Sequence, residues 1–296
     1  MDESQRMMAS SQVSANNGIL YIVATPIGNL ADLSSRAVEV LGSVDRIAAE
    51  DTRHSGKLMQ HCSIQTPLLA LHEHNERKLA PRLVEDMLGG RSIALISDAG
   101  TPLISDPGFN LVRLAREAGV QVVPVPGPSA LICALSASGL PTDRFVFEGF
   151  LPAKSPARRN RLEQLCGETR SLVFFESSHR IVDCLRDCQA VFGAQRQAVV
   201  ARELTKRFET IHSDTLERLA QWVNDDPNQQ KGEIVLLVQG QAETESHQVT
   251  PEAERILLVL LEELPIKKAA KLAARITGVN KRALYERALR VKEARH

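Results

Sequence analysis

The 296-residue chain has no apolar run close to the roughly 18 residues that a membrane-spanning helix needs. Its first 17 residues are rich in Ser, Gln and Asn and lack the apolar core of a signal peptide. These absences predict a cytoplasmic protein with no membrane partner and with a disordered N-terminal extension over residues 1–17. The chain is 43% hydrophobic and 24% charged, which fits about two globular domains and an appendage.

Cysteine is scarce, and its spacing offers no pairing. The five cysteines are odd in number and form no CxxC motif, so neither a disulfide framework nor a zinc site is expected. Cys184 and Cys188, four residues apart, are expected to be ordinary thiols on one helix face. His72 and His74 alternate around Glu73, and their rings would point the same way only at a strand end. No metal site is therefore predicted.

The chain also has no net charge, because 36 basic residues balance 36 acidic ones. This balance hides an asymmetry. Residues 265–296 contain ten Lys or Arg and two Glu, so they carry +8 and the preceding 264 residues carry −8. A nucleic-acid partner would therefore meet basic patches and not a uniformly basic body.

Short apolar runs alternate with helical patterns in residues 18–141, which predicts an α/β domain built on a mostly parallel sheet. Strands are expected at 19–25, 46–50, 67–71, 92–97 and 121–126. Helices are expected at 34–41, 54–60, 76–88 and 109–118. Sheets of this kind bind ligands beyond the carboxyl ends of their strands.

A second α/β domain, of mixed α+β character, is predicted for residues 142–240, after the hinge sequence GLP. Strands are expected at 145–150, 171–176, 198–203 and 234–239, with 208–213 pairing back on its neighbour. Helices are expected at 158–165, 181–192 and 216–224. The polar residues 241–250 read as a linker.

The sequence pattern of residues 251–296 predicts a small helical appendage. Helices are expected at 255–264, 267–275 and 280–290, the last two joined by a turn at 276–279, as in a helix-turn-helix. Asn280 is the expected N-cap. The expected core consists of Ala269, Leu272, Ala273, Leu284 and Leu289. The +8 charge predicts added affinity for RNA, with Lys281 and Arg282 among the contacts; reading of DNA is the alternative.

Three loops rich in Gly and Pro follow strands of the first domain, at 24–30, 97–108 and 124–130. A single loop of this type reads as a tight turn, but three at successive strand ends predict a shared ligand site. The chain lacks GxGxxG and GxxxxGK[ST], which disfavours a dinucleotide fold and a phosphate-cradling loop. Asp98 favours a cationic ligand that bears a nucleoside.

Eight sequence blocks occur in one order along the chain. They are VATPIGNL (23–30), AEDTR (49–53), SDAGTPLISDPG (97–108), PVPGPSA (124–130), FEGFLP (147–152), FESSHRI (175–181), ARELTKRFE (201–209) and KGEIVLLV (231–238). On these blocks the chain resembles the ribosomal RNA small subunit methyltransferase I family, which belongs to the tetrapyrrole methylase-like, class III S-adenosylmethionine methyltransferases. Phe175 and Ser178 depart from the family, where Tyr and often Pro are expected, and this puts a role for a ring hydroxyl in doubt.

The resemblance implies a tetrapyrrole methylase-like fold of two α/β domains, with the cofactor cleft between them and a small helical C-terminal appendage. It implies 2′-O-methylation of a decoding-centre cytidine, position 1402 of 16S ribosomal RNA in the 30S subunit, by a homodimer without metal. The second domain would close over the methyl donor, S-adenosylmethionine, near Phe175 and 201–204. The implied donor-binding residues are Pro26, Ser97, Asp98, Ala99, Gly100, Thr101, Ser129 and Ala130.

A ribose hydroxyl is a weak nucleophile, so its proton must be accepted or its developing negative charge stabilised. Glu50 or Glu203 is expected to take the proton. Arg53 or Lys206 is expected to stabilise the oxyanion or to grip phosphate. The alternative is that each carboxylate only holds a neighbouring cation.

Four further cations crowd the start of a helix with no acid among them, namely Lys154, Arg158, Arg159 and Arg161. Phosphate contact is expected there, with a solvated helix face as the alternative. His179, beside Arg180, could equally cap a helix or contact RNA. Two other functions stay open: a tetrapyrrole C-methylase or diphthine synthase, and a noncatalytic RNA-binding or ribosome-assembly module.

Overall fold

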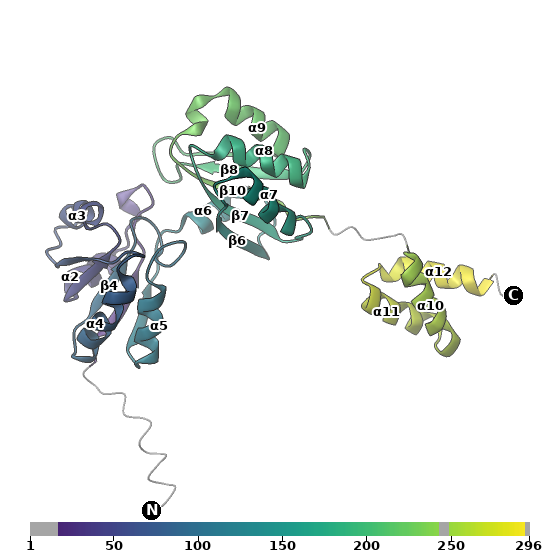
Figure 1. Ribbon diagram of the computed structural model, residues 1–296, viewed down its shortest axis with the longest axis horizontal. Helices are drawn as coiled ribbons and strands as arrows, with labels where there is room; N and C mark the ends of the chain where they lie inside the picture. Colours follow the sequence, from purple (N-terminus) through teal and green to yellow (C-terminus); the bar gives the residue numbers. More distant parts are fainter. Residues whose placement is uncertain (1–16, 243–248, 294–296) are drawn as a thin grey trace, which may run out of the picture. The chain divides into compact units, whose positions relative to one another are not determined.

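The computed structural model describes residues 17–242 and 249–293. The chain forms two compact units, one ending at Gln239 and one beginning at Gly240 (Figure 1). The disorder expected for residues 1–17 falls, except for Asn17, outside the described residues, as does most of the linker expected at 241–250.

The first sheet is entirely parallel, as the alternation of strands and helices predicts. Its strands are β1 (Ile19–Val23), β2 (Arg46–Ala49), β3 (Leu68–Ala70), β4 (Ile93–Ile96) and β5 (Gln121–Val125). They lie in the order β3-β2-β4-β1-β5. Because all five run the same way, their carboxyl ends and the loops that follow share one edge.

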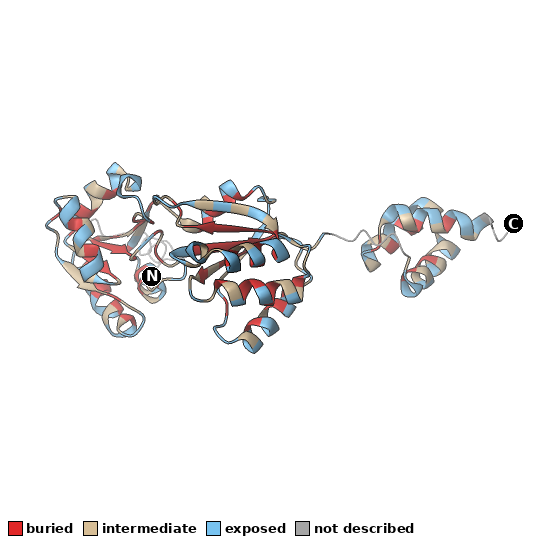
Figure 2. Ribbon diagram, turned by 90° about the horizontal axis from the view of Figure 1, so that it is seen from above, coloured by how far each residue is buried: buried red, intermediate tan, exposed pale blue. Residues whose placement is uncertain are grey.

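Helices cover both faces of this sheet. They are α2 (Ser35–Ser43), α3 (Thr52–His61), α4 (Glu76–Leu88) and α5 (Phe109–Glu117), with a short 3-10 turn, η2, at Leu30–Asp32. Successive strand residues point to opposite faces, so Leu95 packs with α4 and α5, whereas Ala94 and Ile96 pack with α2 and α3. Figure 2 shows the strands buried between these layers.

Glu76 fixes where α5 begins. Gly108, at the N-cap of α5, has no side chain that could accept a hydrogen bond. The buried carboxylate of Glu76 takes over this role and accepts a hydrogen bond from the backbone N–H of Leu111 at 3.1 Å. A negative charge is favourable at a helix N-terminus, so this contact anchors the end of the 97–108 loop.

The second sheet is mixed, as expected. Its strands are β6 (Phe145–Phe150), β7 (Ser171–Ser177), β8 (Gln197–Arg202), β9 (Thr210–Thr215) and β10 (Glu233–Val238). In the order β6-β7-β10-β8-β9, only β6 and β7 pair in parallel. One face packs against α7 (Ser155–Gln164), α8 (Ile181–Phe192) and α9 (Leu216–Asp225), and the 3-10 turn η3 (Pro227–Gln230) follows α9.

Helix α6 (Ala130–Ser138) covers the other face, and the sequence pattern did not predict it. Its sequence, ALICALSAS, is apolar almost throughout and so shows no helical alternation of apolar and polar residues. Leu131, Ala134 and Leu135 pack into one cluster with the second sheet, including Val173 and Val199. The chain thus leaves the first sheet, forms α6 against the second, and ties both halves into one unit.

The C-terminal unit consists of α10 (Pro251–Glu263), α11 (Ile266–Thr277) and α12 (Lys281–Glu293). Gly278 ends α11 in a left-handed conformation, and the Asn280 side chain accepts a hydrogen bond from the backbone N–H of Arg282, which agrees with its expected capping role. Two expected core residues are corrected: Leu272 is 42% exposed and Leu289 is 38% exposed. The small core is built mainly from alanines, because the helices approach closely.

Among the described helices, none is both long and apolar enough to cross a membrane. All five cysteines are free, and Cys184 and Cys188 are buried on α8 as ordinary thiols.

Leu135→Ala tests the role of α6. Leu135 is 4% exposed in the cluster against the second sheet, and we expect its truncation to lower the free energy of unfolding by about 2–5 kcal/mol. Ile132, on the same helix, is 54% exposed, so Ile132→Ala should change it by less than about 0.5 kcal/mol. Denaturant unfolding of both variants measures this. Equal losses would contradict the assignment of α6 as the packing element.

Candidate active site

A cavity of about 440 Å³ is lined by residues of both halves of the first unit. The first half contributes Ile27, Glu50, Asp98, Ala99, Gly100, Thr101, Ile104, Ser105, Asp106, Ser129 and Ala130. The second half contributes Phe150, Phe175, Glu176, Ser177, Ser178, Leu204, Gly232, Glu233, Ile234 and Val235. The cavity therefore lies at the carboxyl edge of the first sheet, where the parallel topology predicts a ligand.

The three Gly/Pro-rich loops are joined by backbone and side-chain hydrogen bonds. Thr25 and Gly100 exchange two backbone hydrogen bonds, of 2.9 and 3.0 Å, which link the first loop to the second. The Thr101 hydroxyl donates to the carbonyl of Pro128 at 3.1 Å, which links the second to the third. Gly100 has a φ of +80°, a backbone conformation that favours glycine. The three loops thus form one fixed wall.

Three carboxylates, Glu50, Asp98 and Asp106, give this wall negative charge. Asp98 accepts a hydrogen bond from the backbone N–H of Asp51 at 3.0 Å, which holds the end of β2 against the second loop. Burial raises the pKa of Glu50, and the charges of Asp106 and Asp98 raise it further. Burial also raises the pKa of Asp106, although a hydrogen bond with Ser97 opposes the shift. Such a wall favours a cationic ligand.

The opposite wall combines an aromatic and apolar surface with the polar residues Glu176, Ser177, Ser178 and Glu233. The ring of Phe175 meets the rings of Phe150 and Phe147 edge to face, with centroids 5.7 and 4.8 Å apart. Leu204 and Val235 extend this surface. The ring of Phe175 therefore serves as an apolar wall, for which no hydroxyl is needed.

A polar cluster stands at the rim of the cavity, on the loop after β8. The ammonium of Lys206 donates to Glu203 at 2.7 Å and to Glu233 at 3.0 Å. Burial alone would raise the pKa of Glu203, but its hydrogen bonds with Lys206 and the Glu233 backbone outweigh it, and the pKa is lowered. Burial would likewise lower the pKa of Lys206, but both carboxylates together raise it. Lys206 therefore stays cationic and engaged.

The same loop has little freedom to move. Glu203 and Thr205 adopt positive φ angles of 53° and 65°, which is uncommon for residues other than glycine. A Cβ added at Gly28 would lie 2.4 Å from Cγ of Lys206, so the lysine stem packs on the first loop. The two halves meet here across the cavity.

The structure separates the predicted site residues into groups. Those in the cavity wall are Glu50, Asp98, Ala99, Gly100, Thr101, Ser129 and Ala130. Pro26 and Ser97 do not line the cavity; Pro26 is half-buried, and the buried Ser97 hydroxyl donates to the Ala99 carbonyl at 3.3 Å. Arg53, Glu203 and Lys206 do not line it either, although two neighbours of these residues, Leu204 and Glu233, do.

Sequence reasoning missed Asp106 and Phe150. Asp106 lies in the SDAGTPLISDPG block, where a second acidic residue in the same loop was the available signal. Phe150 lies in the FEGFLP block and is 56% exposed. A large exposed ring at the end of a strand is a feature of binding surfaces, but periodicity alone does not distinguish it from a core residue.

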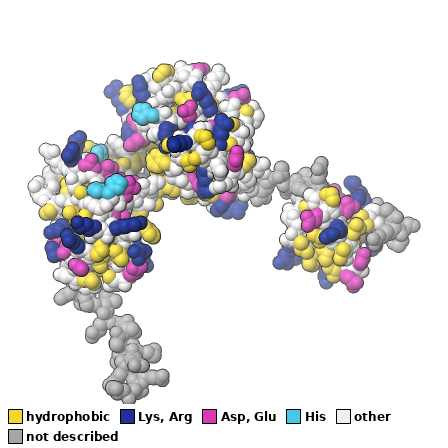
Figure 3. Space-filling view, viewed as in Figure 1, with side chains coloured by type: hydrophobic (Ala, Val, Ile, Leu, Met, Phe, Trp, Pro, Cys, Tyr) yellow, Lys and Arg dark blue, Asp and Glu magenta, His cyan; other side chains and the backbone are white. Residues whose placement is uncertain are grey.

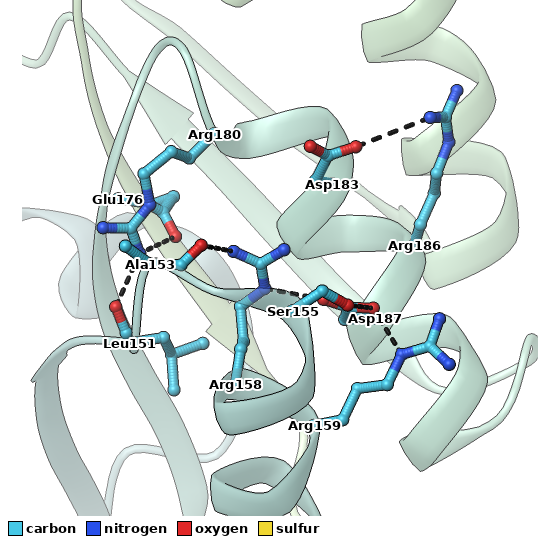
Figure 4. A network of polar contacts seen from close by, with 10 residues as sticks. All are labelled: Leu151, Ala153, Ser155, Arg158, Arg159, Glu176, Arg180, Asp183, Arg186 and Asp187. Atoms are coloured by element: carbon cyan, nitrogen blue, oxygen red, sulfur yellow. Dashed lines mark hydrogen bonds and ion pairs between the residues drawn. The ribbon is translucent and has the colours of Figure 1, made fainter.

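The basic patch on α7 needs one correction (Figure 4). The side chain of Arg158 is 2% exposed, and its Nε donates to Asp187 at 2.7 Å, so Arg158 is an internal residue and not an RNA contact. Arg159 donates to the same carboxylate at 2.6 Å, and Arg161 pairs with Glu148 at 2.6 Å. The acids come from α8 and β6, which the local sequence of α7 could not reveal.

Figure 4 also shows why the FESSHRI segment keeps its shape. The buried carboxylate of Glu176 pairs with Arg180, and Arg180 also donates to the carbonyl of Leu151. This contact joins the ends of β6 and β7, next to the aromatic wall. His179 lies in the turn between them and α8.

The rings of His72 and His74 lie 5.9 Å apart, and no group of three or more potential metal ligands occurs among the described residues.

Comparison with known proteins defines the class. The family model for Tetrapyrrole (Corrin/Porphyrin) Methylases matches residues 19–220, and that for the RsmI C-terminal HTH domain matches residues 247–292. Among solved structures, diphthine synthase aligns with a TM-score of 0.59 at 16% identity over 76% of this chain and 91% of its own. Cobalt precorrin-4 methyltransferase aligns with a TM-score of 0.55 at 17% identity, over 74% of this chain and 94% of its own. The fold is that of the tetrapyrrole methylases, and the chain is an S-adenosylmethionine-dependent methyltransferase.

Curated relatives narrow the class to a family. The chain is 59% identical to the protein named "Ribosomal RNA small subunit methyltransferase I" from Pseudomonas aeruginosa, over 92% of this chain and 97% of that protein. It is 56% identical to the protein of the same name from Haemophilus influenzae, over 91% of this chain and 95% of that protein. The chain therefore belongs to the ribosomal RNA small subunit methyltransferase I family.

Gly232→Ala tests the loop contact beside the cavity. Gly232 has a φ of +83°, and an added Cβ would lie 2.2 Å from the Glu203 carboxylate. We expect donor affinity to fall roughly tenfold, because Glu203, Lys206 and Leu204 must shift. Gly193 has a φ of +94° and no atom near an added Cβ, so Gly193→Ala carries similar backbone strain without the clash. Calorimetric titration with S-adenosylmethionine compares them; equal affinities would exclude the steric explanation.

Proposed function

We propose that this enzyme transfers a methyl group from S-adenosylmethionine to the ribose 2′-oxygen of a decoding-centre cytidine in 16S ribosomal RNA, cytidine 1402 of the 30S subunit. The names of its relatives, the donor cavity and the basic C-terminal helices support the small-subunit RNA as substrate. A ribosomal substrate also places the reaction in the cytoplasm. The observation that carries the chemistry is a partly buried carboxylate, Glu50, in the wall of the donor cavity.

Glu50 is the better candidate for the base. The bound donor supplies a methyl group on a sulfonium, and much of the acceleration must come from holding the hydroxyl in line with it. The new C–O bond forms as the C–S bond breaks, and the hydroxyl proton passes to the carboxylate of Glu50. Its raised pKa makes Glu50 the stronger base, whereas the lowered pKa of Glu203 makes that residue a weaker one.

The two candidate cations, Lys206 and Arg53, also have different roles. Lys206 is held by two carboxylates, so its role is to fix the rim of the cavity. Arg53 is exposed near the start of α3, three residues after Glu50, and is free to contact a phosphate of the acceptor. Lys154, Arg159 and Arg161 remain candidates for RNA contact at a second place, with the last two already bound to carboxylates.

The C-terminal unit adds affinity for RNA in this proposal. Lys281 and Arg282 are exposed at the start of α12, and Arg282 pairs with Glu286 at 3.1 Å. Figure 3 shows hydrophobic side chains gathered on the visible face of this unit, so its contacts need not be purely ionic. A homodimer is also part of the proposal, and light scattering of the purified chain measures it.

Methyl transfer tests the proposed function directly. Radiolabelled S-adenosylmethionine is incubated with 30S subunits that lack the modification, and digestion of the RNA locates the label. We expect it on the 2′-oxygen of the decoding-centre cytidine. Tight donor binding without transfer to 30S subunits would mean that the acceptor is wrong and would reopen the small-molecule substrates.

Glu50→Gln tests the base. A carboxylate accepts a proton only when ionised, so the wild-type rate should fall as the pH drops through the raised pKa of Glu50. The variant should lose this acidic limb and about 10²–10⁴-fold in kcat, measured at saturating donor. Glu73 is exposed, and its charge adds to the raised pKa of Glu50, so Glu73→Gln should move the limb to lower pH and keep kcat. A Glu50→Gln rate within a few-fold of wild type would remove Glu50 from the mechanism.

Truncation after Thr250 tests the C-terminal unit. Because this unit is compact by itself, its removal should leave donor affinity unchanged. Affinity for 30S subunits should fall, and the dependence of log K on log salt should become flatter, since fewer counterions are released. Filter binding at several salt concentrations measures both. Unchanged binding would assign the unit another role.

A further inference from the structure

Helix α3 has an outer surface without a single acidic residue. Each of α2, α4 and α5, the other helices on the first sheet, carries at least one Asp or Glu. The exposed residues of α3 are Arg53, His54, Lys57, Gln60 and His61.

These side chains form one stripe along the helix. Arg53, Lys57 and His61 follow one another at intervals of four residues, about 6 Å along the axis, and so lie on one face. Ser55 and Met59 occupy the opposite face and are buried toward the sheet. The stripe therefore runs the length of the ten-residue helix, about 15 Å.

The stripe begins at the rim of the donor cavity. Glu50 lines the cavity, and the next residue, Asp51, donates its backbone N–H to the cavity residue Asp98 at 3.0 Å. The carboxylate of Asp51 then caps α3 by accepting a hydrogen bond from the backbone N–H of Arg53 at 2.8 Å. The first cation of the stripe is thus fixed three residues from the proposed base.

The cations of the stripe are available for an outside partner. No described carboxylate lies within ion-pairing distance of Lys57, and Asp51, which is close to Arg53 and His54, is already used as the helix cap. The basic residues of α7 differ, because Asp187 and Glu148 engage them. A positive surface leading away from a reaction site is suited to a polyanion that must enter the site at one nucleotide.

We propose that this stripe, Arg53, His54, Lys57 and His61, holds the phosphodiester backbone of the RNA strand next to the nucleotide being methylated. The inference rests on the proposed function, since it assumes an RNA acceptor, and adds where the strand lies. Contacts with phosphate position the strand without reading its sequence. The target ribose then enters the cavity beside Glu50.

Lys57→Glu and Arg116→Glu form a matched pair for the test. Both residues are exposed on helices of the first sheet, and both changes alter the net charge by −2. Arg116, in the last turn of α5, precedes β5 and so belongs to the opposite edge of the sheet. For methylation of 30S subunits, Lys57→Glu should raise KM roughly tenfold and lower the salt slope by about 1, with donor affinity and kcat kept. Arg116→Glu and Lys57→Arg should resemble wild type.

Binding without turnover separates this inference from the proposed function. Fluorescence anisotropy with a 16S RNA fragment that spans the decoding-centre helix should show the same order of affinities. Equal affinities of Lys57→Glu and Arg116→Glu would overturn the stripe, even if the wild-type enzyme methylates 30S subunits. A change in oligomeric state of Lys57→Glu alone, seen by light scattering, would also overturn it and assign α3 to a subunit contact. Failure of wild-type methylation alone would overturn the substrate and leave the binding comparison intact.

Discussion

The packing of α6 against the second sheet is the contact on which the rest of this structure depends. It buries Leu131, Ala134 and Leu135 in one apolar cluster with strands of the other half. Ser129 and Ala130, at the start of the same helix, line the cavity. The hydrophobic effect that joins the halves therefore also fixes the distance between the carboxylate wall and the aromatic wall. A site built from two sheets needs such a rigid connection, because its residues come from distant parts of the chain.

Acidic and basic residues around this site lie on separate, neighbouring surfaces. The cavity wall is acidic, through Glu50, Asp98 and Asp106, whereas α3, which begins at its rim, is free of acids. Surfaces of opposite sign therefore lie only a few residues apart in the chain, as the proposed cationic donor and anionic acceptor require. The pairs Arg158–Asp187 and Lys206–Glu233 have another role, since each holds two segments of the fold together.

Much of the architecture follows from local sequence, but the exceptions have a common cause. The parallel pairing of the first sheet and the turn chemistry of Gly278 and Asn280 could be predicted, because strand alternation and capping depend on near neighbours. Helix α6 could not be predicted, because a helix with an almost entirely apolar sequence lacks the periodic alternation of apolar and polar residues by which helices are recognised. Arg158 was misassigned for a similar reason: its partner, Asp187, lies 29 residues away on another helix. The core positions of Leu272 and Leu289 were predicted wrongly, because helical spacing alone does not show that Ala270 and Ala288 are the residues buried there.

The sequence by itself determined the family, the chemistry of the three loops and the candidate carboxylates, since these reside in contiguous blocks such as SDAGTPLISDPG and AEDTR. Only the tertiary structure decided which of those residues face the cavity and with what proton affinity. Burial and neighbouring charge raise the pKa of Glu50, whereas hydrogen bonds from Lys206 and a backbone amide lower that of Glu203. Glu50 and Glu203, which the sequence alone could not rank as bases, therefore have pKa values shifted in opposite directions in the folded protein. Solvent exclusion and hydrogen bonding, which cause these shifts, depend on residues that meet only after folding.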